Sequence, residues 1–400
     1  MLLLPALPGN ELKMLTLIKN ANLFAPESLG IGYLVLGGGK ILHVGKGKPT
    51  VDNHLVSDNV DLQGATVSPG LIDCHVHVTG GGGEDGFSTQ APPVPLTGFT
   101  RHGVTSVVGL LGTDDETRTT ANLLARTRAL REEGLSAWCW TGGYHLPLTT
   151  LTGSVRSDIV HIDCVIGAGE VAISDHRSSQ PGFDELARLA SEVHVAGLLS
   201  KKAGVLHLHL GDGPRGLFMV RQLLADTELP PRVFHPTHVN RRKELFEEAC
   251  DLSLGHSVID VTAFPVEEGE NAWSAPDAWE RFHEKGCPAG NLTISTDGGG
   301  CLPHFDDNGE MVKMEFATSA GLPGTLRELV SRGHPLDAVL PCMTSNVAQL
   351  LRLRDKGRLV AGADADLVCF DSGHRVRHVM AGGRWMIQDG TPVASGTFEA

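Results

Sequence analysis

The sequence has few basic residues, no closely paired cysteines and no long apolar run. Lys and Arg number 33 against 47 Asp and Glu, which gives a formal net charge of −14. This charge disfavours non-specific binding to nucleic acid or to an anionic membrane, since both require a basic surface. Because no apolar run reaches the length that a bilayer demands, we expect neither nucleic acid nor a membrane as a partner.

Cysteine usage favours a reducing compartment. The eight cysteines are scattered singly and form no CxxC pair, so they do not indicate a disulfide framework. Residues 1–4 are apolar, but this run is short, is interrupted by Pro5 and lacks a basic flank, so we do not expect a secretory signal. We therefore expect reduced thiols in a cytoplasmic protein.

The chain does contain enough apolar material for a sizeable core. Its 400 residues are 41% hydrophobic and 20% charged, which argues against disorder. This length fits one barrel-sized domain and a smaller one. The 49 glycines suit a loop-rich enzyme whose backbone turns tightly at many strand ends.

Both ends of the chain have the pattern of short strands separated by glycine turns. The expected strands near the N-terminus are residues 15–19, 33–36 and 40–44. Those near the C-terminus are residues 365–370, 376–381 and 384–387. We predict a small β-sandwich domain formed from both termini, residues 1–67 and 351–400, and interpret residues 1–13 as an extension ahead of the first strand.

Residues 68–350 alternate between short apolar runs and helix-like stretches. The apolar runs are residues 104–111, 137–141, 164–166, 205–210, 233–237, 258–262 and 292–296. The helix-like stretches include residues 122–133, 183–196, 218–225 and 242–252. This alternation favours a parallel sheet, and the length and repeat favour an α/β fold of the (β/α)8 TIM-like barrel type over an open sheet.

The strongest local signal is residues 69–77, Pro-Gly-Leu-Ile-Asp-Cys-His-Val-His, a strand-like run that ends in His-x-His. Alternate residues of a strand point to the same face, so His75 and His77 can meet one metal ion. A bare His-x-His also occurs by chance on a polar strand edge. Here it ends the first strand of the predicted barrel, where barrel active sites lie.

Further polar residues stand at the ends of other predicted strands, namely Glu170, His209, His238 and Asp297. Because the C-terminal ends of barrel strands share one mouth, we expect these side chains to converge with the histidine pair. Such a set suffices for two divalent ions that share a bridging ligand. His207 lies two residues before His209 and is its nearest competitor.

These motifs resemble the amidohydrolase superfamily (peptidase family M38) from about residue 18 to residue 387. Residues 69–77 are similar to the signature after the first barrel strand, residues 295–298 to the last metal-ligand aspartate, and residues 356–367 to the return into the small β domain. Within the superfamily the chain most resembles the isoaspartyl (β-aspartyl) dipeptidases. The stretches that carry this likeness are residues 80–84, 141–145, 172–177, 209–212 and 236–241.

The resemblance implies a centre of two divalent ions, one held by His75, His77 and Asp297 and the other by His209 and His238. Family members commonly bridge the ions with a carboxylated lysine two residues before an Ala-Ile-Ser-Asp-His-Arg run. Glu170 stands there in this chain. A glutamate also ends in a carboxylate, so we interpret Glu170 as the bridge; the alternative is a surface acid beside a mononuclear site. We expect Zn²⁺, although Mn²⁺ or Co²⁺ would also bind.

The resemblance also implies a substrate-binding set. A β-aspartyl dipeptide carries one ammonium and two carboxylates near the scissile bond. Glu84 would face the ammonium, while Arg177 and Arg241 would pair with the carboxylates through their planar guanidinium forks. The alternative for either arginine is a solvated loop residue. Further substrate contacts are expected from Gly82, Thr113, Tyr144 and Cys301, the last standing where the family more often has serine.

The implied reaction is hydrolysis of the isopeptide bond by a metal-activated hydroxide. Tyr144 would donate a hydrogen bond to the oxyanion, and Asp297 would pass the water's proton to the leaving amine. The alternative role for Tyr144 is a packed aromatic at the barrel mouth. We expect a small dipeptide as substrate and a homo-oligomeric assembly.

Two other functions fit the same metal motifs. One is hydrolysis of a cyclic amide, as in dihydroorotase or hydantoinase, or deacetylation of an N-acyl amino acid. The cyclic-amide enzymes have no need of Glu84, Arg177 and Arg241. The other is a non-catalytic metal-binding scaffold, which would require loss of ligands, whereas every ligand position is filled here.

Overall fold

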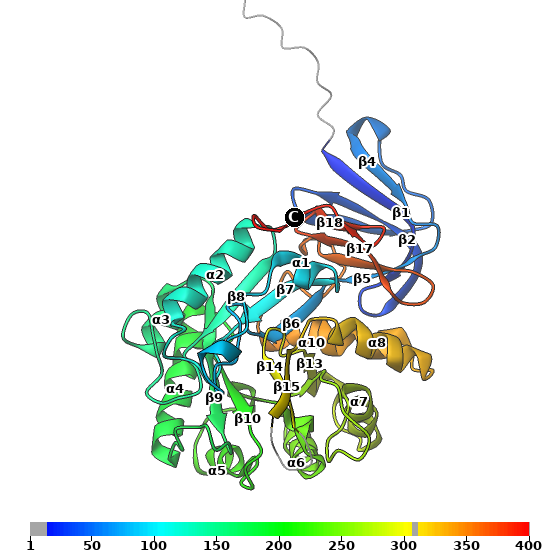
Figure 1. The fold of residues 1–400 in the computed structure, drawn as a ribbon. Coiled ribbons are helices and arrows are strands. Elements are labelled where there is room, and N and C mark those ends of the chain that lie inside the picture. Colours follow the sequence, from blue (N-terminus) through cyan, green and yellow to red (C-terminus); the bar gives the residue numbers. More distant parts are fainter. Residues whose placement is uncertain (1–13, 306–310, 400) are drawn as a thin grey trace, which may run out of the picture.

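The computed structural model describes residues 14–305 and 311–399, and the extension expected at residues 1–13 lies outside the described residues (Figure 1). The central sheet is parallel, and its strands are neighbours in the order in which they follow along the chain. The six strands are β6 (Leu71–Val76), β7 (Val104–Gly109), β8 (Ser136–Thr141), β9 (Val165–Ile173), β10 (Val205–Leu210) and β11 (Phe234–Thr237). Two further parallel strands pair with each other, β12 (Ile259–Thr262) and β13 (Leu292–Ser295). A parallel bridge from Gly298 to Val76 brings the segment after β13 back to β6, which gives a TIM-like barrel.

Helices cover the outside of this barrel (Figure 1). They are α1 (Leu96–Thr100), α2 (Thr120–Glu132), α3 (Val155–His161), α4 (Phe183–Ser200), α5 (Phe218–Asp226), α6 (Lys243–Leu254), α7 (Ala275–Glu284), α8 (Gly321–Ser331), α9 (Leu336–Val339) and α10 (Ser345–Leu350). In α4 the residues Leu186, Leu189, Ala190 and Val193 recur at helical spacing and are buried. This spacing places one apolar stripe against the strands, which is why the segment forms a helix there.

A second sheet joins strands from both ends of the chain. Its nine strands are β1 (Leu15–Phe24), β2 (Ser28–Gly37), β3 (Lys40–Lys46), β4 (Val56–Asp61), β5 (Thr66–Pro69), β16 (Leu367–Phe370), β17 (Val376–Ala381), β18 (Arg384–Gln388) and β19 (Thr391–Pro392). Strand β5 pairs with β1 on one side and with β16 on the other. The first barrel strand, β6, follows β5 after one residue, so this sheet anchors the start of the barrel.

A buried lysine ties the returning chain to the barrel. The ammonium of Lys356 lies 2.5 Å from a carboxylate oxygen of Asp366, 2.7 Å from Asp364 and 2.6 Å from the hydroxyl of Ser136 at the start of β8. Lys356 is 7% exposed, so its charge is compensated by the two carboxylates as burial requires.

All eight cysteines are unpaired, and no helix in the described ranges is long and apolar enough to cross a membrane.

The structure corrects the expected position of Glu170. We expected a strand over residues 164–166 with Glu170 after its end, but β9 continues to Ile173 and Glu170 lies inside it. The glycines before Glu170 are sites of close packing, because a Cβ on Gly167 would lie 2.3 Å from the carbonyl oxygen of Val205 and one on Gly169 would lie 2.5 Å from that of His207. A hairpin that we did not expect, β14 (Cys301–Phe305) with β15 (Met311–Phe316), follows β13.

Candidate active site

Six predicted ligands from five barrel strands and the segments after them meet in one buried cluster. Glu170 lies at its centre. One of its carboxylate oxygens, Oε1, is 2.6 Å from Nδ1 of His209 and 3.0 Å from Nε2 of His238. The other, Oε2, is 3.6 Å from Nε2 of His75 and 4.0 Å from Nε2 of His77. A single carboxylate therefore faces two pairs of imidazoles.

Asp297 completes the cluster on the side of the first histidine pair. Its Oδ1 is 3.0 Å from Nε2 of His77 and 3.3 Å from Nε2 of His75. The backbone of Asp297 has φ of 56° and that of His238 has φ of 59°, in the left-handed region that non-glycine residues seldom adopt. Such backbone conformations persist where the surrounding structure holds a side chain in a required direction.

The donor set fits divalent cations. Within the described ranges, Nε2 of His75, Oε2 of Glu170 and Oδ1 of Asp297 are buried without a hydrogen-bond partner. Ligand atoms within 4.8 Å of one another also form the groups His75–His77–Glu170 and Glu170–His209–His238. Imidazole nitrogens and carboxylate oxygens are ligands that Zn²⁺ and related ions prefer. Glu170 is fully buried and the Asp297 side chain is 21% exposed. Two carboxylates and four imidazoles that converge there with little access to water favour a positive charge between them.

The electrostatics of the site agree with this requirement. Burial, together with the facing Asp297 carboxylate, raises the pKa of Glu170 well above its usual range. Contacts with the imidazoles of His75 and His77 outweigh burial and hold the pKa of Asp297 well below its usual range. Burial lowers the pKa of His209 to about 3. The imidazole is thus neutral at pH 7, as a metal ligand must be.

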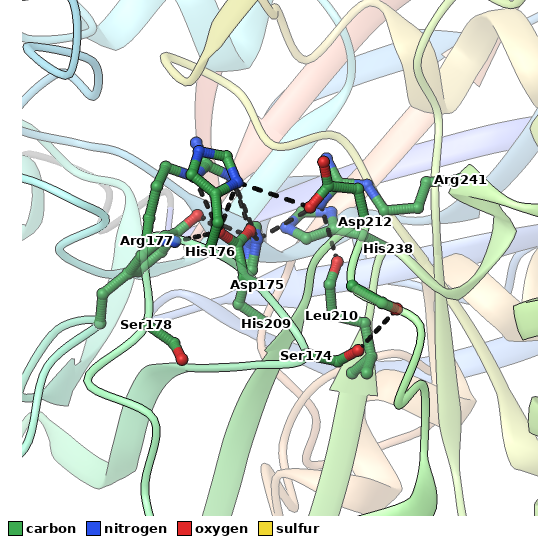
Figure 2. Close-up of polar contacts among 12 residues, drawn as sticks. Ser174, Asp175, His176, Arg177, Ser178, His209, Leu210, Asp212, His238 and Arg241 are labelled. Carbon is green, nitrogen blue, oxygen red and sulfur yellow. Dashed lines mark hydrogen bonds and ion pairs between the residues drawn. The ribbon is translucent and has the colours of Figure 1, made fainter.

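Each of three histidines is held by a second residue that sequence reasoning did not assign. Nε2 of His209 is 2.9 Å from the Asp175 carboxylate (Figure 2), and Nδ1 of His238 is 2.7 Å from the hydroxyl of Thr262. Nδ1 of His75 is 2.8 Å from Nε2 of His207. Asp175 stands inside the motif at residues 172–177, so the motif contained a signal for it. No sequence motif around Thr262 or His207 indicated that these residues would contact His238 and His75.

The predicted charged substrate-binding residues lie at the same mouth. The guanidinium of Arg177 donates two hydrogen bonds to the Asp175 carboxylate, and its Nη1 lies 3.6 Å from the Glu84 carboxylate. Nη1 of Arg241 donates to the carbonyl oxygen of Leu210 at 2.8 Å. Guanidinium nitrogens of both arginines come within 3.4 Å of Nε2 of His209. Neither arginine is therefore a free loop residue in this structure.

Tyr144 lies against the cluster from the loop after β8. Its hydroxyl is 2.8 Å from Nδ1 of His209, and its ring lies under the guanidinium of Arg177 at 5.5 Å. Burial, with a further contribution from the Glu170 charge, raises the pKa of Tyr144 well above its usual value. The phenol therefore keeps its proton at neutral pH and is available as a hydrogen-bond donor.

The remaining predicted residues differ in how directly the structure connects them to the cluster. Gly82 packs against Cys301, because a Cβ on Gly82 would lie 2.2 Å from the Cys301 sulfur. The pKa of Cys301 is raised to about 11 by burial and by the nearby Glu84 and Asp297 charges. Thr113 is half-buried and directly follows Gly112. Gly112 packs against His77, because a Cβ on Gly112 would lie 2.7 Å from the His77 ring.

A TIM-like barrel that gathers four histidines and two carboxylates from its strands and the segments directly after them defines an amidohydrolase with a site for divalent metal ions. The chain is similar over almost its whole length to the crystal structure of a beta-aspartyl dipeptidase from Fervidobacterium islandicum AW-1, solved with the beta-Asp-Leu dipeptide. The two are 39% identical with a TM-score of 0.87, and the match covers 95% of this chain and 98% of that one. The chain belongs to the beta-aspartyl dipeptidase family, so the predicted resemblance is confirmed.

Curated relatives lie further away in the same superfamily. An imidazolonepropionase of Ruegeria sp. (strain TM1040) is 24% identical over 384 residues, which cover 88% of this chain and 90% of the relative. An imidazolonepropionase of Burkholderia ambifaria (strain MC40-6) is 39% identical over 93 residues, but this match spans only 22% of this chain and 23% of the relative's length. No family model matches the chain.

Proposed function

We propose that this protein hydrolyses the isopeptide bond of β-aspartyl dipeptides in a reaction that depends on divalent metal ions. One observation carries the proposal: Glu84, Arg177 and Arg241 border the same cluster of ligands. Arg177 lies 3.6 Å from Glu84, and both arginines come within 3.4 Å of His209. The related Fervidobacterium enzyme was solved with beta-Asp-Leu, which has the charges that these three groups complement.

The charges of the substrate assign a partner to each of the three residues. Glu84 would accept hydrogen bonds from the α-ammonium of the aspartyl residue. Arg177 and Arg241 would pair with its α-carboxylate and with the C-terminal carboxylate, since the guanidinium fork matches a carboxylate in plane and spacing. Gly82, Thr113 and Cys301 would border the substrate on the side of the first histidine pair.

The metal ligands would divide as the family resemblance implies. His75, His77 and Asp297 would hold one ion, His209 and His238 the other, and the Glu170 carboxylate would contact both. We expect Zn²⁺ at both positions. When bound, such ions polarise the scissile carbonyl and lower the pKa of a water molecule to about 7.

Two residues of the chain would then move or hold protons. Asp297 would accept a proton from the attacking water and deliver it to the leaving amine. Tyr144, which keeps its proton because burial raises its pKa, would donate a hydrogen bond to the oxygen of the scissile carbonyl as negative charge develops there. Arg177 and Arg241 would keep the substrate in place during both transfers.

Substrate preference tests this proposal directly. We expect kcat/KM for β-Asp-Leu to exceed that for α-Asp-Leu by about 10- to 150-fold, because the α-linked peptide displaces a charge and loses a charge-assisted hydrogen bond of about 1.5–3 kcal/mol. A hydantoin, which lacks the ammonium and both carboxylates, is expected to react more slowly still. Faster turnover of the hydantoin would instead identify a cyclic-amide hydrolase.

Replacement of Glu84 by glutamine should separate binding from chemistry. The amide keeps the shape of the side chain but loses the charge that pairs with the ammonium, so we expect KM to rise about 10- to 100-fold with kcat changed only a few-fold. Steady-state kinetics with β-Asp-Leu measure this. Asp85→Asn is the matched control, because Asp85 is the exposed neighbouring acid, and its KM should stay at the wild-type value. A loss of kcat in Glu84→Gln without a change in KM would contradict the assignment.

A further inference from the structure

A row of buried side chains leads from the candidate metal centre across the barrel interior. Nδ1 of His75 lies 2.8 Å from Nε2 of His207, and Nδ1 of His207 lies 2.9 Å from Nδ1 of His235. Nε2 of His235 is 2.9 Å from the hydroxyl of Thr293, which donates to the Asp260 carboxylate at 2.5 Å. These five residues come from five different barrel strands, and each is 0% exposed.

The far end of this row can only accept hydrogen bonds. The Asp260 carboxylate also receives the hydroxyl of Thr237 at 2.7 Å and that of Ser295 at 2.5 Å. The alternative acceptor for Thr293, the carbonyl oxygen of Ile259, is further away at 3.3 Å. The Thr293 hydroxyl thus gives its proton to Asp260 and offers its lone pairs to His235.

This arrangement sets the tautomer of each histidine in turn. If Thr293 accepts from Nε2–H of His235, Nδ1 of His235 is an acceptor and receives Nδ1–H of His207. Nε2 of His207 is then an acceptor for Nδ1–H of His75. The remaining nitrogen of His75, Nε2, carries a lone pair, and it faces Asp297 at 3.3 Å and Glu170 at 3.6 Å.

We infer that His207 and His235 are positioning residues that hold His75 in its metal-binding tautomer, with Asp260 as the anchor of the row. The inference rests on the proposed function, because it concerns one of the proposed ligands. Trp140 stacks on His207 with ring centroids 5.4 Å apart and planes at 17°, which fixes the orientation of the middle ring. A partner on the outer nitrogen of a ligating histidine orients the ring and raises its basicity.

Metal affinity is the property that this row should control. We would prepare metal-free wild type, His207→Leu and His207→Gln and titrate each with Zn²⁺ against a chromophoric chelator. Leucine cannot accept a hydrogen bond from His75, so we expect the affinity for one of the two ions to fall about 10- to 100-fold. Glutamine presents one acceptor and one donor group, so His207→Gln should bind Zn²⁺ within about threefold of wild type.

A second variant changes the row at Thr293 and leaves all three histidine rings in place. Thr293→Val removes the hydroxyl between His235 and Asp260 at nearly constant volume, and we expect it to weaken Zn²⁺ binding in the same direction, by about three- to tenfold. Thermal unfolding of the metal-free proteins is the structural readout. Unchanged Zn²⁺ affinity in both His207→Leu and Thr293→Val, with only the metal-free stability reduced, would overturn the inference.

The same titration separates this inference from the proposed function. Wild type that takes up no divalent ion would overturn the metal centre and the positioning role together. Wild type that binds two ions, with the His207→Leu and Thr293→Val variants binding them equally well, would overturn the positioning role alone.

Discussion

Replacement of Glu170 by glutamine is expected to remove most of the bound divalent metal and to lower kcat/KM by at least about 10³-fold. One carboxylate oxygen of Glu170 faces His209 and His238, and the other faces His75 and His77, at distances between 2.6 and 4.0 Å. The amide loses the negative charge and replaces one oxygen by an N–H group that cannot bind a cation. Metal ions contribute several kcal/mol to hydrolysis of this kind, which corresponds to the expected loss.

The measurement is metal content by elemental analysis together with steady-state kinetics. Asp158→Asn is a suitable control, because Asp158 is also a fully buried carboxylate but accepts hydrogen bonds from Thr141 and Thr152 away from the cluster. It should lose stability while keeping its metal. A Glu170→Gln protein with two bound ions and wild-type turnover would show that Glu170 is not a shared ligand.

Replacement of Asp297 by asparagine is expected to lower kcat by about 10²- to 10⁴-fold while part of the metal is retained. Asparagine keeps an oxygen that can face His75 and His77 but cannot accept and return a proton at neutral pH. The backbone of Asp297 lies in the left-handed region with φ of 56°, which asparagine tolerates, so the fold should be preserved. KM for β-Asp-Leu should change little.

A control for this substitution exists in the same chain. Asp389 has φ of 46° and pairs with Arg377 on the surface, so Asp389→Asn makes the same chemical change in the same backbone region outside the cluster. Its kcat should equal that of wild type. Normal turnover in Asp297→Asn, measured beside this control, would rule out Asp297 as the group that moves the proton.

Most strands could be predicted because each is a short apolar run bounded by turns. The run at residues 205–210 coincides with β10 of the barrel, and that at residues 376–381 coincides with β17 of the second sheet. The β14–β15 hairpin could not be predicted in this way, since it lies at the barrel mouth and carries no strong apolar alternation. The domain division at residues 67 and 351 stays a prediction.

The strand that carries Glu170 is longer than we predicted from the sequence. The apolar run on which we based the predicted strand ends at residue 166, immediately before Gly167 and Gly169. In the barrel they are needed because a Cβ at Gly167 would also lie 2.7 Å from the Trp140 ring. Glycine marks close approach as well as turns, and only the neighbouring strands reveal which of the two applies.

The sequence by itself determined which residues could carry the chemistry. Ligand types, their places near strand ends and the longer motifs around them were enough to predict the barrel, the cluster and the family. Only the tertiary structure decided that one Glu170 carboxylate faces both histidine pairs and that His207 and His235 lie in a row behind His75. The physical reason is the separation along the chain of the residues involved. Strand periodicity is a property of neighbouring residues. Contacts among five strands arise only when the barrel closes and brings distant side chains within hydrogen-bond distance.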